Sequence, residues 1–84
     1  MTDVEIKAAV VRALGRIAPE AEPASIRSDV PLREQVDIDS MDFLNFVIEL
    51  DRELHVAVPE ADYAKLRTLD DAAAYFANRL ARAT

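Results

Sequence analysis

Residues 37–54 read DIDSMDFLNFVIELDREL and show the periodicity of an amphipathic helix. Large apolar residues recur at helical spacing on one face, which predicts a helix from about Ser40 to Leu54. The residues of this predicted core face are Phe43, Phe46, Val47, Leu50 and Leu54. A second apolar strip, rotated away from the core face and next to Asp42, Asn45 and Glu49, consists of Met41, Leu44 and Ile48. The helix therefore keeps an apolar strip after its core face is buried.

A helix is also predicted upstream, from about Thr2 to Ile17 or Ala18. Thr2 and Glu5 have the spacing of a capping box, in which the hydroxyl and the carboxylate bond free backbone amides at the helix start. An apolar stripe follows, made of Ile6, Val10, Leu14 and Ile17. The prolines at positions 19 and 23 prevent the helix from continuing.

Two more helical segments are predicted downstream. Pro59 starts a short segment of about two turns over residues 60–66. Thr68 and Asp71 repeat the capping spacing and predict a last helix that ends near Ala81. Its expected core face consists of Leu69, Ala72, Ala73, Tyr75, Phe76, Ala77 and Leu80.

Residues 19–38 show no sustained period and contain three prolines, which indicates a long loop. Because a structureless connection of this length is unusual in a compact domain, we expect its apolar residues to pack down as anchors, with room for a helical turn. These residues are Ile26, Val30, Leu32 and Val36. The predicted fold is all-α: a small four-helix bundle with a long loop between helices one and two and a short third helix. We expect residues 1–84 to form a single domain.

Composition excludes several classes of protein. With 84 residues, the chain has no room for a deep enzymatic cleft, so we expect no enzyme. The absence of cysteine excludes a disulfide framework and a thiolate metal site. No apolar run reaches the roughly 18 residues of a membrane span, and the N-terminus lacks a basic signal, so no membrane insertion and a cytoplasmic location are expected. A monomer is expected.

The acidic charge is concentrated in one region. The net charge is −6, and residues 34–62 contain nine acidic side chains against a single basic one, Arg52. Nucleic acid is a poor partner for such a chain, because binding it requires clustered lysine and arginine. Partner proteins should instead offer basic surfaces.

Ser40 lies within this acidic region. The residues around Ser40 do not by themselves decide its role. Either Asp39 or Ser40 suits the N-cap of the predicted helix. An EF-hand calcium loop starting at Asp37 fails, because Asp42 would replace the required glycine and Ile48 the required glutamate. His55 lies about four turns further along the same helix, roughly 22 Å away, so it cannot activate Ser40 and is expected to be a helix-terminus residue.

The run Asp39-Ser40-Met41-Asp42-Phe43-Leu44, followed by residues 47–54 and by Val58-Pro59, resembles the acyl carrier proteins. In that family the second helix opens with Asp-Ser-Leu, continues as an acidic and apolar helix, and is followed by Ile-Pro or Val-Pro. The long first loop, the brief third helix and the start of the last helix at residues 68–72 also look like the family. The resemblance covers nearly the whole chain.

The resemblance implies that Ser40 bears a covalent 4′-phosphopantetheine arm from coenzyme A. A separate phosphopantetheinyl transferase would attach it, and Asp39 would help position that enzyme's magnesium ion. The chain would then be a free-standing carrier. The thiol of its arm would hold acyl groups as thioesters for fatty acid, polyketide or specialised lipid biosynthesis. Acyl-transferring and acyl-modifying enzymes with basic docking patches would contact a surface made of Met41, Asp42, Leu44, Asn45, Ile48, Glu49 and Glu53.

The chain departs from the family pattern at three positions: Met41 replaces the commoner leucine, Asn45 a frequent glutamate, and His55 a frequent glycine. Phe43 and Phe46 add bulk where such proteins can enclose an acyl chain, so we expect short or externally exposed chains. Two alternatives remain at this point. One is an aryl or peptidyl carrier of a non-ribosomal assembly line, and the other is an acidic helical binding module in which Ser40 is only an N-cap.

Overall fold

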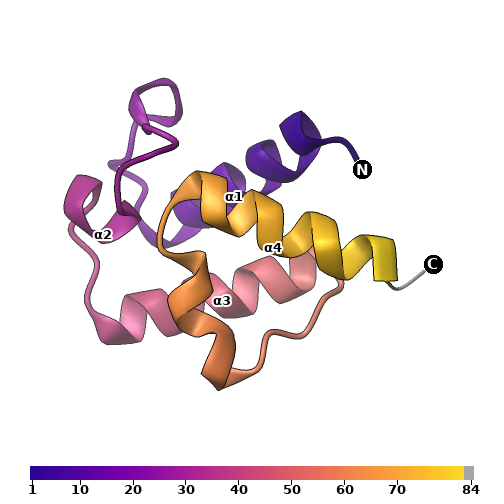
Figure 1. Cartoon of the computed structure of the whole chain (residues 1–84). Helices are drawn as coiled ribbons and strands as arrows, with labels where there is room; N and C mark the ends of the chain where they lie inside the picture. Colours follow the sequence, from indigo (N-terminus) through magenta and orange to yellow (C-terminus); the bar gives the residue numbers. More distant parts are fainter. Residues whose placement is uncertain (83–84) are drawn as a thin grey trace.

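A computed structural model describes residues 1–82, so the last two residues of the predicted domain 1–84 lie outside the described range. The described chain is helical and contains no strand, which confirms the predicted all-α class. Figure 1 shows α1, α3 and α4 side by side, with the long loop rising on one side of the bundle. The elements are α1 (Asp3–Ile17), η1 (Pro23–Ser25), α2 (Leu32–Gln35), α3 (Ser40–Leu54), η2 (Glu60–Leu66) and α4 (Leu69–Arg82).

The boundaries of α1 follow from its cap. Thr2 Oγ1 accepts a hydrogen bond from the Glu5 amide at 3.1 Å, and Glu5 Oε1 accepts one from the Thr2 amide at 2.8 Å. This capping box satisfies two amides that otherwise have no partner at a helix start. The predicted box is confirmed, and the helix ends at Ile17, two residues before Pro19.

The bounds of α3 also agree with the prediction, from Ser40 to Leu54. His55 terminates the helix: its backbone is left-handed, with φ 55°, and its amide donates to the Asp51 carbonyl at 2.7 Å. The structure thus confirms His55 as a helix-terminus residue. A non-glycine residue in this conformation is uncommon.

The long loop is not structureless. It contains the short helices η1 and α2, and Leu32 and Val36 are buried, so the expected anchoring is confirmed for these two residues. The segment over residues 60–66 forms with the predicted bounds but as a 3-10 helix. The connection therefore packs onto the bundle at α2, directly before the chain enters α3.

One apolar core joins α1, α3 and α4. α1 packs against both α3 and α4, and the largest fully buried side chains are Phe46, Phe76, Ile6, Leu14, Leu32, Leu50, Leu66 and Val10. One residue of the predicted core faces of α3 and α4 was wrong: Ala77 is exposed on the outer face of α4. Phe43, Tyr75 and Leu80 are only partly buried and pack against the edge of the core.

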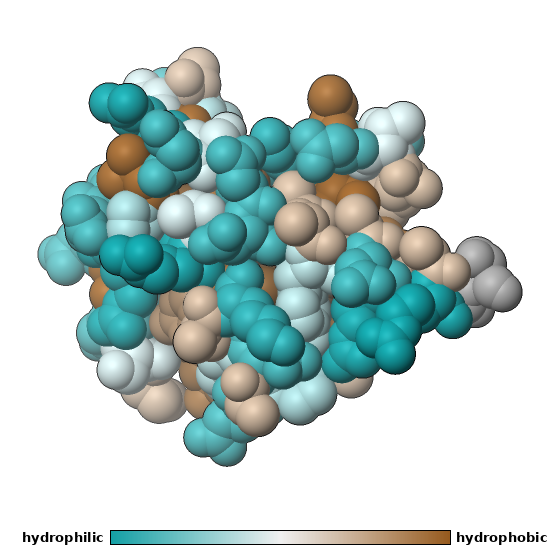
Figure 2. All heavy atoms as spheres, in the orientation of Figure 1, coloured by the Kyte–Doolittle hydropathy of each residue, from teal (hydrophilic) through white to brown (hydrophobic). Residues whose placement is uncertain are grey.

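The outer surface is mostly polar. The face drawn in Figure 2 is largely hydrophilic, and its apolar atoms form small patches separated by polar side chains. None of the helices within residues 1–82 is long and apolar enough to span a bilayer.

Candidate functional site

Ser40 is the first residue of α3 and its side chain is exposed. Among the described residues, no hydrogen bond engages its hydroxyl. The hydroxyl stands on a 15-residue helix whose far side is packed into the core. Ser40 is therefore a rigidly mounted, accessible hydroxyl that another molecule can reach.

Asp39, and not Ser40, caps α3. Asp39 Oδ1 accepts a hydrogen bond from the Asp42 amide at 2.8 Å, and Asp42 Oδ2 accepts one from the Asp39 amide at 3.2 Å. The two carboxylates form a capping box, and they also complement the positive end of the helix dipole. This arrangement overturns the alternative in which Ser40 is only an N-cap. It leaves the serine hydroxyl with no structural task.

Two substitutions of Asp39 separate its cap from its charge. Asp39→Ala is expected to lower the free energy of unfolding by about 1 kcal/mol, because the Asp42 amide loses its acceptor. Asp39→Asn keeps an acceptor oxygen and should lower the free energy of unfolding by only about a few tenths of a kcal/mol. It nevertheless removes the carboxylate predicted to position the transferase's magnesium ion. Urea denaturation and the loading rate check the two effects. Equal stability of all three proteins would contradict the capping role, and an unchanged loading rate for Asp39→Asn would contradict the metal-positioning role.

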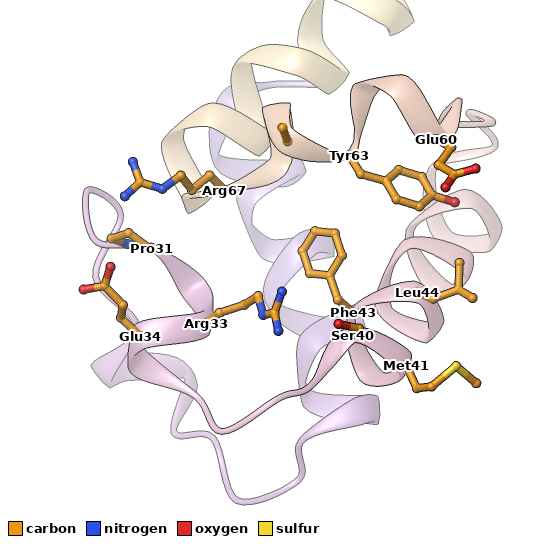
Figure 3. A pocket seen from close by; sticks show the side chains of 11 residues that line it. Pro31, Arg33, Glu34, Ser40, Met41, Phe43, Leu44, Glu60, Tyr63 and Arg67 are labelled. Carbon is orange, nitrogen blue, oxygen red and sulfur yellow. The ribbon is translucent and has the colours of Figure 1, made fainter.

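A groove of about 920 Å³ opens beside Ser40, between α2, the start of α3 and η2. We call it the Ser40 groove. Figure 3 shows Phe43 rising in the middle of the groove, Tyr63 above it and Arg33 reaching in from α2. The residues that line it are Pro31, Arg33, Glu34, Ser40, Met41, Phe43, Leu44, Glu60, Tyr63, Ala64 and Arg67.

Aromatic contacts join this groove to the core. The Phe43 ring lies 5.8 Å from the ring of the fully buried Phe46 and 6.3 Å from that of Tyr63, in an edge arrangement. Such tilted and edge contacts are favourable geometries for aromatic pairs. The half-buried position of Phe43 therefore has a reason: one side of its ring packs on the core and the other side borders the groove.

The helix η2, which provides one wall of the groove, is fastened to α4 by a polar network. The Tyr75 hydroxyl donates to Asp62 Oδ2 at 2.8 Å and accepts from Arg79 Nε at 3.1 Å. The hydrogen bond from Tyr75 is the largest of the influences that hold the pKa of Asp62 below its ordinary value of 3.8. The carboxylate form of Asp62 is thus favoured in the folded protein.

Tyr75→Phe is expected to destabilise the protein in a pH-dependent way. Because the pKa of Asp62 is lowered by folding, its contribution to stability is present above pH 3.8 and is lost as the pH falls through the lower folded value. The difference in urea midpoint between wild type and Tyr75→Phe should therefore be largest near neutral pH and shrink below about pH 4. A difference that stays constant from pH 7 to pH 3 would show that the Tyr75 bond does not favour the charged form.

The second apolar strip of α3 is exposed. Met41 is 65% exposed, Leu44 37% and Ile48 45%, which confirms that the helix keeps an apolar strip after its core face is buried. Asn45 is exposed beside the strip, and Asp42 lies at its start with one oxygen in the capping box. These five predicted docking residues share one accessible face.

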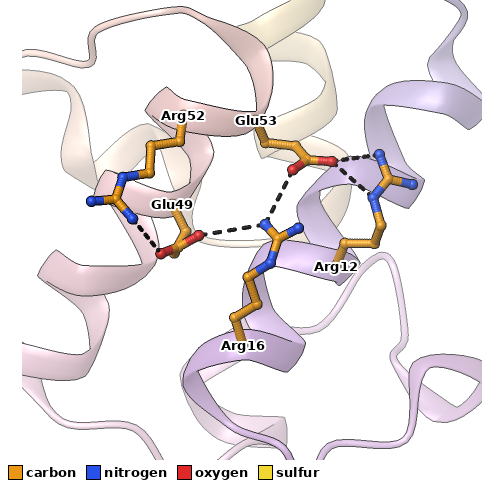
Figure 4. Close-up of polar contacts among 5 residues, drawn as sticks. All are labelled: Arg12, Arg16, Glu49, Arg52 and Glu53. Carbon is orange, nitrogen blue, oxygen red and sulfur yellow. Dashed lines mark hydrogen bonds and ion pairs between the residues drawn. The ribbon is translucent and has the colours of Figure 1, made fainter.

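Glu49 and Glu53 have intramolecular partners that the sequence did not reveal. Arg12 binds Glu53 through Nε at 2.8 Å and through Nη2 at 2.7 Å, and Arg16 bridges Glu53 at 3.1 Å and Glu49 at 3.4 Å (Figure 4). Arg52 adds a contact to Glu49 at 3.4 Å. Arg12 and then Arg16 hold the pKa of Glu53 below its ordinary value. We call this set of five side chains the α1–α3 charge cluster.

Comparison with known proteins identifies the family of this domain. Residues 4–76 match the family described as "Phosphopantetheine attachment site", which defines the class: a carrier domain that bears a covalent arm. The acyl carrier protein of Rhodococcus erythropolis is 32% identical over 69 residues, covering 79% of this chain and 76% of the relative. That of Bdellovibrio bacteriovorus is 25% identical over 71 residues, covering 84% and 85%. The chain belongs to the acyl carrier protein family.

Family membership fixes the general chemistry. The cofactor is 4′-phosphopantetheine, bound covalently, and the domain is a carrier and not an enzyme. Its partners are a phosphopantetheinyl transferase and acyl-handling enzymes. The residues present fit this cofactor, because attachment needs an accessible hydroxyl, and the Ser40 hydroxyl is exposed and has no hydrogen bond within residues 1–82.

Proposed function

We propose that Ser40 is the attachment site of the phosphopantetheine arm, and that residues 1–84 act as one carrier domain for acyl groups in fatty acid, polyketide or specialised lipid biosynthesis. The observation that supports this proposal most directly is that two different residues cap α3 and offer the hydroxyl. Asp39 caps the helix, and the neighbouring hydroxyl is left exposed and unbonded. The other two serines, Ser25 and Ser28, lie in the long loop, and Ser28 is half-buried.

The proposed loading reaction uses few groups of the carrier. Ser40 Oγ attacks the phosphorus next to the pantetheine of coenzyme A, the bond from that phosphorus to the bridging oxygen breaks, and adenosine 3′,5′-bisphosphate leaves. A base must accept the serine proton, and His55 cannot do so from the opposite end of a helix roughly 22 Å long. The transferase therefore supplies the base. Asp39, with only one oxygen engaged in the cap, has a second oxygen for the transferase's magnesium ion.

We propose that the exposed face of α3 is the docking surface for the partner enzymes, with Met41, Leu44 and Ile48 at its centre. Their exposed fractions leave an apolar strip that a small contact could cover. Asp42 and Asn45 lie beside the strip, and Glu49 and Glu53 lie further along the helix, so a partner should combine apolar and basic side chains. Small, charge-led interfaces dissociate quickly, as a shuttling carrier requires.

Intact-protein mass spectrometry tests the attachment proposal. The protein is incubated with coenzyme A, magnesium and a broad-specificity phosphopantetheinyl transferase, then digested to locate the modification. A single phosphopantetheine adduct on the peptide that contains Ser40 is expected. An adduct on a peptide containing Ser25 or Ser28 would overturn the assignment. So would the absence of any adduct on folded protein under conditions that load another carrier.

A further inference from the structure

Two arginines line the Ser40 groove without a carboxylate partner, unlike most basic side chains of the described residues. Within residues 1–82, Arg33 and Arg67 form no ion pair, although both line the groove. The basic side chains that do pair with carboxylates are Lys7, Arg12, Arg16, Arg27, Arg52, Lys65 and Arg79. An unpaired guanidinium beside a proposed attachment site is available to bind an anion.

The fold holds Arg33 in place. The Gln35 side chain donates to the carbonyls of Arg27 and Val30, at 2.9 and 2.8 Å, and accepts from the Arg27 amide at 2.7 Å. The Leu32 amide donates to the Arg67 carbonyl at 2.9 Å, which ties the start of α2 to the end of η2. Residues on both sides of Arg33 are therefore anchored by hydrogen bonds. These bonds fix the backbone position from which the Arg33 side chain extends.

The side chain of Arg33 points across the groove toward Ser40 and Phe43 (Figure 3). The carboxylate of the next residue, Glu34, points away from it, and Glu60 lies beyond Tyr63 on the far side of the groove. Arg67 also points outward in this view, so we assign it no role. Arg33 is thus the cationic group of the groove lining that is directed at the serine.

An anion attached to Ser40 needs such a cation. Asp39 directly precedes Ser40 and Asp42 follows it two residues later, and both place a carboxylate beside the hydroxyl. The capping box uses the amides of Asp39 and Asp42. Of the amides at the helix start, those of Ser40 and Met41 are left to offset the charge of a phosphodiester.

We propose that Arg33 binds the phosphodiester of the arm on Ser40, and that this contact lays the pantetheine part of the arm along the groove wall formed by Phe43, Leu44 and Tyr63. A guanidinium suits this task because its N–H groups form a planar fork that matches two phosphate oxygens. The groove wall is largely apolar and suits the methyl groups of pantetheine. This inference rests on the proposed attachment at Ser40.

NMR spectroscopy of the loaded protein tests the inference, after mass spectrometry has established that every sample is fully loaded. Wild type should show nuclear Overhauser contacts between the geminal methyl groups of the arm and the rings of Phe43 and Tyr63, together with a shift of the Arg33 Nε–H signal on loading. Arg33→Gln should lose these contacts while it still becomes loaded. Arg52→Gln, which removes the same charge at the opposite end of α3, should keep them.

The outcomes separate this inference from the function on which it rests. Fully loaded wild type without contacts between arm and groove would overturn the inference and leave the attachment at Ser40 intact. Contacts that persist unchanged in Arg33→Gln would overturn the role of Arg33. Failure of wild type to become loaded would overturn the proposed function and this inference together. Loss of the contacts in Arg33→Gln, with partial recovery in Arg33→Lys, is the expected result.

Discussion

Replacing Ser40 by alanine is expected to abolish phosphopantetheine loading while the free energy of unfolding stays within about 0.5 kcal/mol of wild type. The first effect follows because alanine has no nucleophilic oxygen. The second follows from the cap: Asp39 supplies the acceptor for the Asp42 amide, and the Ser40 hydroxyl makes no hydrogen bond within residues 1–82. Alanine is also a better helix former than serine. Intact mass after the transferase reaction and urea denaturation measure the two effects.

Ser25→Ala is the matched control for this experiment, since it removes an exposed hydroxyl outside α3 and should load like wild type. An adduct on Ser40→Ala would mean that another side chain is the acceptor. A loss of about 1 kcal/mol or more in Ser40→Ala would mean that the serine contributes to the cap in solution. Either result would require a different account of the start of α3.

Phe46→Ala is expected to lower the free energy of unfolding by about 3–5 kcal/mol. The Phe46 side chain is fully buried in the core between the helices, so its removal leaves a cavity as well as a loss of buried apolar surface. Small domains are typically stable by only about 5–15 kcal/mol, so the substitution removes much of the total. The urea midpoint, followed by circular dichroism, should fall accordingly.

Met41→Ala is the control on the same helix. Met41 is 65% exposed, and its truncation should change the free energy of unfolding by less than about 0.5 kcal/mol. Comparable losses in the two variants would contradict the assignment of one residue to the core and the other to the exposed strip. Because Phe46 also supports the ring of Phe43, its removal should in addition shift the NMR signals of the Tyr63 ring across the groove.

The sequence predicted the long helices well because each carries its own signals. The apolar period of α3 and the capping residues of α1 lie within single segments, and their bounds agree with the structure. The helix α2 spans four residues, which is too short to show a period, so the sequence indicated only room for a helical turn. Phe43 has the correct spacing for the core, but the groove lies where the core ends, and spacing cannot reveal that limit.

The site was predictable only in part. Ser40 and Asp39 could be proposed as site residues because they belong to one contiguous motif. The Ser40 groove could not, because α2, α3 and η2 bring its residues together from positions 31 to 67. Arg33 lies immediately outside the acidic region of residues 34–62, and nothing in the sequence singled it out. The fold directs its side chain toward the serine (Figure 3).

The α1–α3 charge cluster bears on the proposed docking surface. Glu53 already contacts Arg12 and Arg16, and Glu49 already contacts Arg16 and Arg52. These contacts offset part of the negative charge that an approaching basic surface would meet at this end of α3. A partner enzyme that also offers acidic side chains to Arg12 and Arg16 would gain contacts with both helices, so we expect partner choice to depend on the pattern of charge and not only on its total.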